Sequence, residues 1–306
     1  MNSRNHGNVG AAAATRPLLI AIMVTSSFTV IEFIGGILTD SLALMSDAGH
    51  MFTDTLALAL SLGAMRVAMR PSSEEMTFGF LRAEILAALV NGATLILVSL
   101  LIFSEALERI LEPPEIEAPL MLLVAVLGLA ANAAGIYLLH DKSKGSLNVR
   151  GAFLHMLGDL LSSIAVIVGA LLIMLFDLRI ADPLLGILIG AIILYGSWKL
   201  VTQSTAILLE SVPSHLKLGD IRMSLQSVGG VVEIHDLHVW TLTSGLHAMS
   251  AHVVVEDRRI SDCAGIVQEC ERLLKERFSI SHTTFQLEFK TCGENACVFV
   301  STRPLH

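Results

Sequence analysis

The amino-acid sequence predicts an all-α bundle of six transmembrane helices followed by a small α+β domain, and three observations carry this prediction. The 306 residues are 53% hydrophobic and only 16% charged, which is typical of a membrane protein with some soluble sequence attached. Six apolar stretches approach the length of about 20 residues that is needed to cross a hydrocarbon core about 30 Å thick. After Glu210 such stretches stop, and shorter helical and alternating patterns replace them.

The predicted spans form a membrane domain over residues 18–204, with charged, glycine or proline turns between them. Before this domain lies a short cytoplasmic N-terminal segment, residues 1–17. The first apolar run is followed by no small-residue cleavage pattern, so we expect a retained helix rather than a signal peptide. The predicted spans are 18–38, 42–65, 83–103, 118–139, 152–176 and 184–201.

Lysine and arginine residues near the span ends predict the orientation. Nine of them fall on one side of the membrane, whereas the other side has only Arg109 and Arg179. Because positively charged loops remain in the cytoplasm, we expect a multi-pass protein of a bacterial-type inner or plasma membrane with both termini cytoplasmic. The net charge of -8 argues against nucleic acid as a partner, because nucleic-acid binders present a basic face.

The sequence after the spans predicts a domain over residues 211–290 and a tail over residues 291–306. Helical patterns at 213–227 and 261–278 alternate with strand patterns at 231–241, 247–255 and 282–290. The order is helix, strand, strand, helix, strand, and a serine–glycine turn joins the first two strands. We expect a small antiparallel sheet with the helices on one face.

Two pairs of ionisable residues lie inside the apolar runs, His50 with Asp54 and His155 with Asp159. A spacing of four residues places both side chains of a pair on one face of a helix, about one turn apart. Ionisable groups at membrane depth are costly and indicate a functional site. Two imidazoles and two carboxylates suit a tetrahedral divalent ion, zinc first among them. The alternative is that each pair only forms hydrogen bonds between helices.

Asp47 precedes His50 by three residues and lies near the same helix face. Its carboxylate can orient His50 as an outer-shell group or relay protons. It can equally cap the beginning of the helix, and the sequence leaves both roles open.

Four motifs together resemble the cation diffusion facilitator family, and the resemblance extends over residues 17–288. The motifs are SDAGHMFTD at 46–54, FGFLRAE at 78–84, HMLGD at 155–159 and HDLHVW at 235–240. The family implies six helices, a cytoplasmic ferredoxin-like domain, a homodimer and transport by alternating access. His50, Asp54, His155 and Asp159 match the family's intramembrane metal ligands, and a histidine at position 50 resembles the zinc-transporting branch of these metal/proton antiporters.

The resemblance also implies a metal site in the cytoplasmic domain. His235, His252 and Glu288 match ligand positions, and His282 is a further candidate. The alternative is that these histidines are only half-buried polar residues of the strands. Cys292 and Cys297 in the tail either donate thiolates to a neighbouring subunit's site or are free cysteines, since their spacing is loose for a zinc site.

The expected function is efflux of a divalent cation by proton-coupled antiport. An empty site with two aspartates carries two negative charges, which either a divalent ion or protons neutralise, so metal and protons compete. Zn²⁺ is the expected transported ion, with Cd²⁺, Co²⁺ and Fe²⁺ open, and no organic cofactor is expected. The partners are then metal ions, protons, membrane lipid and a second copy of the chain.

Two other classes of function compete with transport. An intramembrane zinc metalloenzyme commonly uses an H-E-x-x-H motif and a general base, and the sequence lacks this motif, so we predict that the protein is not an enzyme. A non-transporting metal sensor would leave the membrane residues without a role, because an anchor needs no ligands at membrane depth.

Overall fold

The computed structural model describes residues 26–68, 70–140 and 147–290. The description includes no side chains at positions 54, 57, 58, 61, 62, 65, 138–140 and 147–155. The chain divides into two compact units, one within Met1–Leu62 and Val90–Val201 and the other within Gly63–Leu89 and Thr202–His306. We call them the helical unit and the sheet unit.

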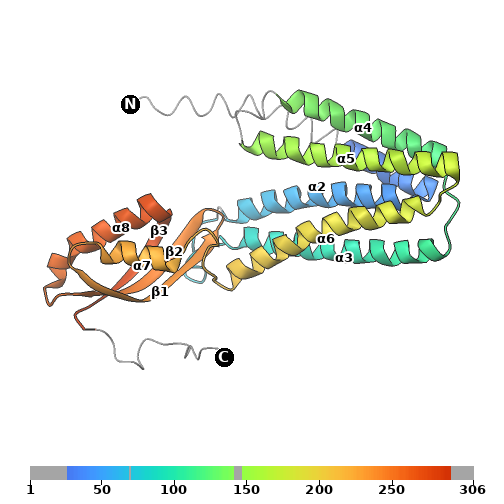
Figure 1. Ribbon diagram of the computed structural model, residues 1–306. Helices are drawn as coiled ribbons and strands as arrows, with labels where there is room; N and C mark the ends of the chain where they lie inside the picture. Colours follow the sequence, from blue (N-terminus) through green and yellow to red (C-terminus); the bar gives the residue numbers. More distant parts are fainter. Residues whose placement is uncertain (1–25, 69, 141–146, 291–306) are drawn as a thin grey trace. The chain divides into compact units, whose positions relative to one another are not determined.

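Six helices follow one another in the described residues from Ser26 to Leu208 (Figure 1). Ser26–Thr39 is a shorter apolar helix, and residues 18–25 of the first predicted span lie outside the described residues. Four of the others contain segments long and apolar enough to cross a membrane. The bounds are α2 Leu42–Ala68, α3 Ala83–Leu111, α4 Ala118–His140, α5 Leu147–Phe176 and α6 Ala181–Leu208. The predicted succession of helices is therefore confirmed.

The helical unit has a packed interior and an apolar exterior. Leu44, Met121 and Val166 are fully buried side chains of its core. Leu101 is 60% exposed and Tyr195 is 78% exposed, although both lie on long apolar helices. Apolar side chains directed outward at this density suit a lipid environment rather than water.

Glycines let helix α6 approach two other helices closely. A Cβ atom at Gly186 would lie 3.0 Å from Cγ of Leu42, and one at Gly190 would lie 2.9 Å from Cε1 of Phe103. The first contact joins α6 to α2 and the second joins α6 to α3. Small residues spaced four apart are common where membrane helices cross, because the missing side chains let the two backbones come close.

The beginning of α2 is capped by a residue of α6. Asp182 is fully buried, and its carboxylate accepts hydrogen bonds from the backbone N–H groups of Leu42, at 2.7 Å, and Ala43, at 3.2 Å. It also accepts one from the Ser41 hydroxyl. The first N–H groups of a helix have no partner within the helix, so a carboxylate supplied by another helix satisfies them.

The sheet unit contains a three-stranded sheet in the order β1-β2-β3. The hairpin of β1 and β2 turns at Ser244 and Gly245, where Gly245 has a φ of 75°, so the predicted serine–glycine turn is confirmed. The elements are α7 Leu218–Gln226, β1 Val231–Thr243, β2 Leu246–Val255, η1 Ile260–Cys263, α8 Ala264–Phe278 and β3 Ile280–Glu288.

The sheet is mixed, so the expectation of a purely antiparallel sheet is wrong. β1 pairs with β2 in the antiparallel sense, but β3 pairs with β2 in the parallel sense. The physical reason is the connection. A helix, α8, carries the chain from the end of β2 back to its beginning, and such a crossover brings the next strand in parallel.

Helices α7 and α8 pack against the sheet and bury its apolar side. Ile221 of α7 and Leu274 of α8 are fully buried against alternate residues of the strands, including Met249 and Val253. Side chains of successive strand residues point to opposite faces, so His252 is directed away from this core. The second face therefore carries the histidines that the sequence singles out.

The beginning of α3 and the residue before it also belong to the sheet unit. Glu84 accepts hydrogen bonds from Thr243 Oγ1 at 2.7 Å and Ser244 Oγ at 3.1 Å, at the turn of the hairpin. Arg82 donates to Glu210 at 2.7 Å. These contacts fix residues 82–84 on the end of the hairpin and on the segment that follows α6.

Candidate metal centre

A hydrogen bond joins the two helices that carry the His/Asp pairs. The hydroxyl of Ser162 in α5 donates to Oδ1 of Asp47 in α2 at 2.7 Å. Asp47 is only 1% exposed, so the contact lies inside the helical unit. Helices α2 and α5 are therefore neighbours at this point.

The two pairs lie at matching heights from this contact. Figure 1 shows α2 and α5 running in opposite directions, since the colours along them change in opposite senses. His50 lies three residues after Asp47 in α2, and Asp159 lies three residues before Ser162 in α5. Because the two helices are antiparallel, both residues are displaced from the Asp47–Ser162 contact by about 4.5 Å in the same direction along the helix axes. Asp54 and His155 lie a further four residues along, about 6 Å.

Both described members of the predicted set, His50 and Asp159, interact electrostatically with Asp47. Asp159 is 2% exposed and His50 is half-buried. Asp54 lies in α2 and His155 in α5, but their side chains lie outside the described residues. The described residues therefore bring one histidine and one aspartate of the predicted set to the same region of the interior.

Asp47 does not cap its helix, so that interpretation is wrong. Helix α2 begins at Leu42, five residues before Asp47, and Asp182 performs the capping. Asp47 instead accepts a hydrogen bond from Ser162, and it interacts electrostatically with Glu32 of the helix Ser26–Thr39. The orienting and proton-relay roles of Asp47 remain predictions.

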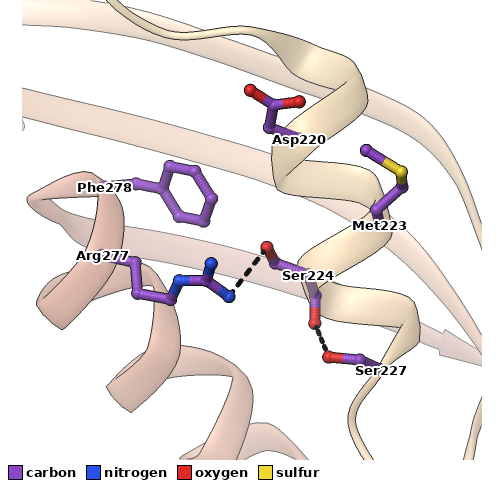
Figure 2. Close-up of a pocket in the computed structure, with 6 residues that line it drawn as sticks. All are labelled: Asp220, Met223, Ser224, Ser227, Arg277 and Phe278. Atoms are coloured by element: carbon purple, nitrogen blue, oxygen red, sulfur yellow. Dashed lines mark hydrogen bonds between the residues drawn. The ribbon is translucent and has the colours of Figure 1, made fainter.

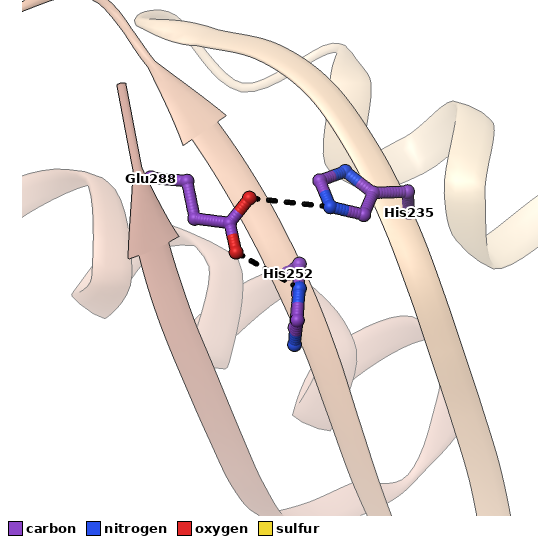
Figure 3. A group of neighbouring side chains, drawn as sticks. All are labelled: His235, His252 and Glu288. Carbon is purple, nitrogen blue, oxygen red and sulfur yellow. Dashed lines mark ion pairs between the residues drawn. The ribbon is translucent and has the colours of Figure 1, made fainter. Parts of the chain in front are cut away.

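A second cluster lies on the face of the sheet opposite α7 and α8 and takes one residue from each strand (Figure 3). Nε2 of His235 in β1 lies 3.2 Å from Oε2 of Glu288 in β3. Nδ1 of His252 in β2 lies 2.9 Å from Oε1 of the same carboxylate. The register explains this meeting, because His235 is directly opposite His252 and Glu288 pairs two residues further along β2.

The donor set of this cluster fits a divalent cation. One ligand atom from each of the three side chains can be chosen so that all lie within 4.8 Å of one another. Bonds of 2.0–2.2 Å from zinc to nitrogen or oxygen place ligand atoms about 3.3 Å apart, so small side-chain rotations suffice. The side chains are 17%, 18% and 12% exposed, which leaves room for a fourth ligand such as water.

The other predicted ligands of the cytoplasmic site lie elsewhere. His282 is opposite Ala248, six residues before Glu288 on β3, and its ring packs edge-on against Phe78 at 5.5 Å. Six strand residues span about 20 Å, so His282 is not near the cluster. Cys292 and Cys297 lie outside the described residues.

A pocket of about 490 Å³ lies between α7 and α8, on the opposite side of the sheet (Figure 2). Arg277 donates to the Ser224 hydroxyl at 3.4 Å and lies over the ring of Phe278, while Asp220 stands across the opening. It contains one carboxylate and no imidazole or thiolate, so it lacks the donors of a zinc site.

Membrane-spanning helices with His/Asp positions at one height, and a small sheet domain with a second imidazole and carboxylate cluster, define a class: membrane proteins that handle metal cations. Comparison with known families identifies this class. Residues 18–209 match the cation efflux transmembrane domain, and residues 213–290 match the cytoplasmic domain of cation efflux proteins. The chain belongs to the cation efflux family.

Characterised relatives are similar along almost their whole length. The chain is 40% identical over 284 residues to the cadmium, cobalt and zinc/H(+)-K(+) antiporter of Bacillus subtilis, covering 92% of this chain and 91% of that one. It is 41% identical over 279 residues to the metal cation efflux system protein CzcD of Cupriavidus metallidurans, covering 91% and 88%. It is 38% identical over 284 residues to the zinc transporter ZitB of Escherichia coli, covering 92% and 90%.

Membership of this family shows an integral membrane protein that transports metal cations and is not an enzyme. The cytoplasmic domain is the dimer-forming domain of the family, which fits the expected homodimer. The predicted resemblance to cation diffusion facilitators is therefore confirmed.

Proposed function

We propose that this protein exports Zn²⁺ from the cytoplasm in exchange for protons, with His50, Asp54, His155 and Asp159 binding the ion. The observation that carries the proposal is the Ser162–Asp47 hydrogen bond of 2.7 Å, which supports placing both His/Asp pairs on facing helices at matching heights. Relatives named as zinc transporters and as cadmium, cobalt and zinc antiporters support the choice of ion. Cd²⁺ and Co²⁺ are the next candidates, and Fe²⁺ has no support from these names.

The coupling follows from the charges of the site. Two aspartates without a cation repel each other in a region that water does not screen. A divalent ion removes this repulsion, and so do protons, because nitrogen and carboxylate ligands must be deprotonated to hold metal. If the site opens to each side in turn, an inward proton gradient drives the metal outward.

Asp47 has a separate role in this proposal. The hydrogen bond from Ser162 joins α5 to α2 three residues before His50, and Glu32 of the preceding helix interacts electrostatically with the same carboxylate. Asp47 orients the first His/Asp pair and offers protons a carboxylate next to the metal position. We expect Asp47→Asn to keep the bond from Ser162 and to reduce the dependence of transport on the pH gradient.

The experiment is metal flux in liposomes that contain the purified protein, with and without an imposed pH gradient. The proposal expects flux of Zn²⁺ that rises with the gradient, and loss of flux in Asp159→Asn and Asp54→Asn. Asp177→Asn is the matched control, because Asp177 is an exposed acid whose side chain is 78% accessible. Flux that ignores the gradient contradicts antiport, and flux that survives Asp159→Asn contradicts the site. A panel of Zn²⁺, Cd²⁺, Co²⁺ and Fe²⁺ decides the preference.

We further propose that His235, His252 and Glu288 hold a regulatory cation in the cytoplasmic domain. Both termini of the chain lie on the cytoplasmic side in this proposal. A cation at His235, His252 and Glu288 joins three strands and favours one arrangement of the dimer, which shifts the population of transport states. The double variant His235→Ala, His252→Ala should retain the membrane site and lose the dependence of transport rate on cytosolic metal. An unchanged dependence contradicts this role.

A further inference from the structure

A β-bulge in β1 places two consecutive residues on the same face of the sheet. His235 is opposite His252, but the next pair joins His238 to Ser250, so two residues of β1 stand against one of β2. Ile234 and Leu237 on either side are buried in the core, at 3% and 7% exposure. His235 and Asp236 between them are both directed to the face opposite α7 and α8. In a regular strand they would point to opposite faces, and bulges commonly re-aim a side chain in this way.

The backbone of the bulge is held in an uncommon conformation. Asp236 has a φ of 47°, in the left-handed region that few residues other than glycine adopt. Aspartate and asparagine tolerate this region better than most residues, but it still costs free energy. A backbone conformation of this cost is expected where the fold must hold the carboxylate of Asp236 in one particular position.

That carboxylate faces the ring of His252 from the side opposite Glu288. Oδ2 of Asp236 lies 3.5 Å from Nε2 of His252, while Nδ1 of the same ring lies 2.9 Å from Glu288. Oδ1 of Asp236 lies 2.9 Å from Nε2 of His238, which anchors the carboxylate. A contact of 3.5 Å is long for an N–H···O bond, and a small rotation of the imidazole shortens it to about 2.9 Å.

A neutral imidazole carries a proton on one ring nitrogen and a lone pair on the other. Only the nitrogen with the lone pair can bind a cation, and only the other can donate a hydrogen bond. A cation seated between His235, His252 and Glu288 needs the lone pair on Nδ1 of His252. The proton must then reside on Nε2, where Asp236 accepts it. Histidines that bind metals in proteins usually donate their other N–H to a carboxylate or carbonyl, which fixes the tautomer and strengthens the ligand.

We propose that Asp236 is the positioning residue of the cytoplasmic metal site, holding His252 in the tautomer and orientation that bind the cation without touching the cation itself. This inference rests on the proposed binding of a cation by His235, His252 and Glu288. It assigns a role to the second residue of the HDLH segment, which the sequence alone does not distinguish from its neighbours.

The test measures Zn²⁺ affinity of the full-length purified protein, by competition with a chelating dye. All variants carry Asp54→Ala and Asp159→Ala, so that the membrane site does not contribute. Asp236→Gly removes the carboxylate while suiting the left-handed backbone, and Asp236→Asn keeps a neutral acceptor there. Asp257→Asn is the control, because it removes one negative charge from the exposed turn after β2.

We expect Asp236→Gly to weaken Zn²⁺ binding about 10- to 100-fold and Asp236→Asn to weaken it less, with Asp257→Asn within twofold of the parent. The visible absorption of bound Co²⁺ at saturation should be the same in all of them, because the ligands are unchanged. The melting temperature without metal should also be unchanged in Asp236→Asn.

Two results overturn the inference. Binding by Asp236→Gly within twofold of the parent means that Asp236 does not position His252. A changed Co²⁺ spectrum in both Asp236 variants means that it is a direct ligand. Failure of the underlying site is distinguishable, because His252→Ala would then bind Zn²⁺ as tightly as the parent.

Discussion

Replacing Asp182 by alanine should detach the beginning of α2 from α6. The carboxylate accepts three hydrogen bonds, from the hydroxyl of Ser41 and from the N–H groups of Leu42 and Ala43. All of these groups are buried. Alanine leaves no acceptor for the two N–H groups, and water has no ready access to them.

The expected cost follows from these contacts. A buried donor left without a partner costs about 1–3 kcal/mol. The Ser41 hydroxyl can rotate toward another acceptor, so only the two N–H groups are counted, which gives about 2–6 kcal/mol for Asp182→Ala. Asp182→Asn keeps one oxygen acceptor and should cost about half as much.

The assay is reversible unfolding in mixed micelles, followed by the fluorescence of Trp198 in α6, with Trp240, the other tryptophan, replaced by phenylalanine in every variant. Asp177→Asn provides the matched control, because its carboxylate is exposed and pairs with Arg179 at 3.0 Å at the surface. An exposed ion pair contributes at most about 1 kcal/mol. The reasoning is refuted if the free energy of unfolding of Asp182→Ala lies within about 0.5 kcal/mol of that of the Asp177→Asn control, which is roughly the usual error.

Three further predictions concern packing and titration. Gly190→Ala should destabilise the protein by about 1–3 kcal/mol, because the added Cβ would lie 2.9 Å from Phe103. A Cβ at Gly196 would meet nothing within 4 Å, so Gly196→Ala should not destabilise it. Melting temperatures of the two variants test this difference. Burial, with the neighbouring His215, lowers the pKa of His247, so the unfolded state binds a proton at higher pH than the folded state does. Stability should therefore fall as the pH drops below 6.5. His247→Gln should reduce this dependence of stability on pH in thermal melts between pH 8 and pH 5.5. Burial, with nearby glutamates, raises the pKa of Cys270 to about 11, so about one molecule in a thousand is a thiolate at pH 8, and mass spectrometry should find Cys270 alkylated by iodoacetamide only after unfolding.

The helices and strands were predictable because their signals are local. Apolar length gives α3 to α6, and the four-residue spacing of the glycines at 186 and 190 indicates by itself that another helix approaches closely. It does not say that Gly186 meets α2 and Gly190 meets α3, since partners depend on the arrangement of all helices. Likewise, the sense of β3 depends on the crossover by α8 rather than on the residues of the strand.

The candidate sites were predictable only in part, for a similar reason. His235, His252 and Glu288 come from motif positions, and their meeting depends on strand register. The histidine at 282 has the same chemistry and was grouped with them, but register places it at the other end of β3. Asp236 was missed because alternation directs it to the opposite face, and only the bulge reverses that.

The contact between Asp47 and Ser162 was also beyond the sequence. A serine in an apolar helix is common and usually bonds to its own backbone, as Ser163 does at 3.0 Å. Nothing local distinguishes Ser162 from Ser163. A serine at the helix position that faces Asp47 is recognisable only once α2 and α5 are known to be neighbours.

The metal-binding cluster has one contributor on each strand, and β3 is an outer strand of the described sheet. Outer strands open first, so their amide hydrogens normally exchange with solvent soonest. A cation held by His235, His252 and Glu288 would pin the end of β3 to the middle of the sheet. Amide exchange in the last residues of β3 would then slow on adding metal, more than anywhere else in the sheet, and the slowing would report occupancy without any measurement of flux.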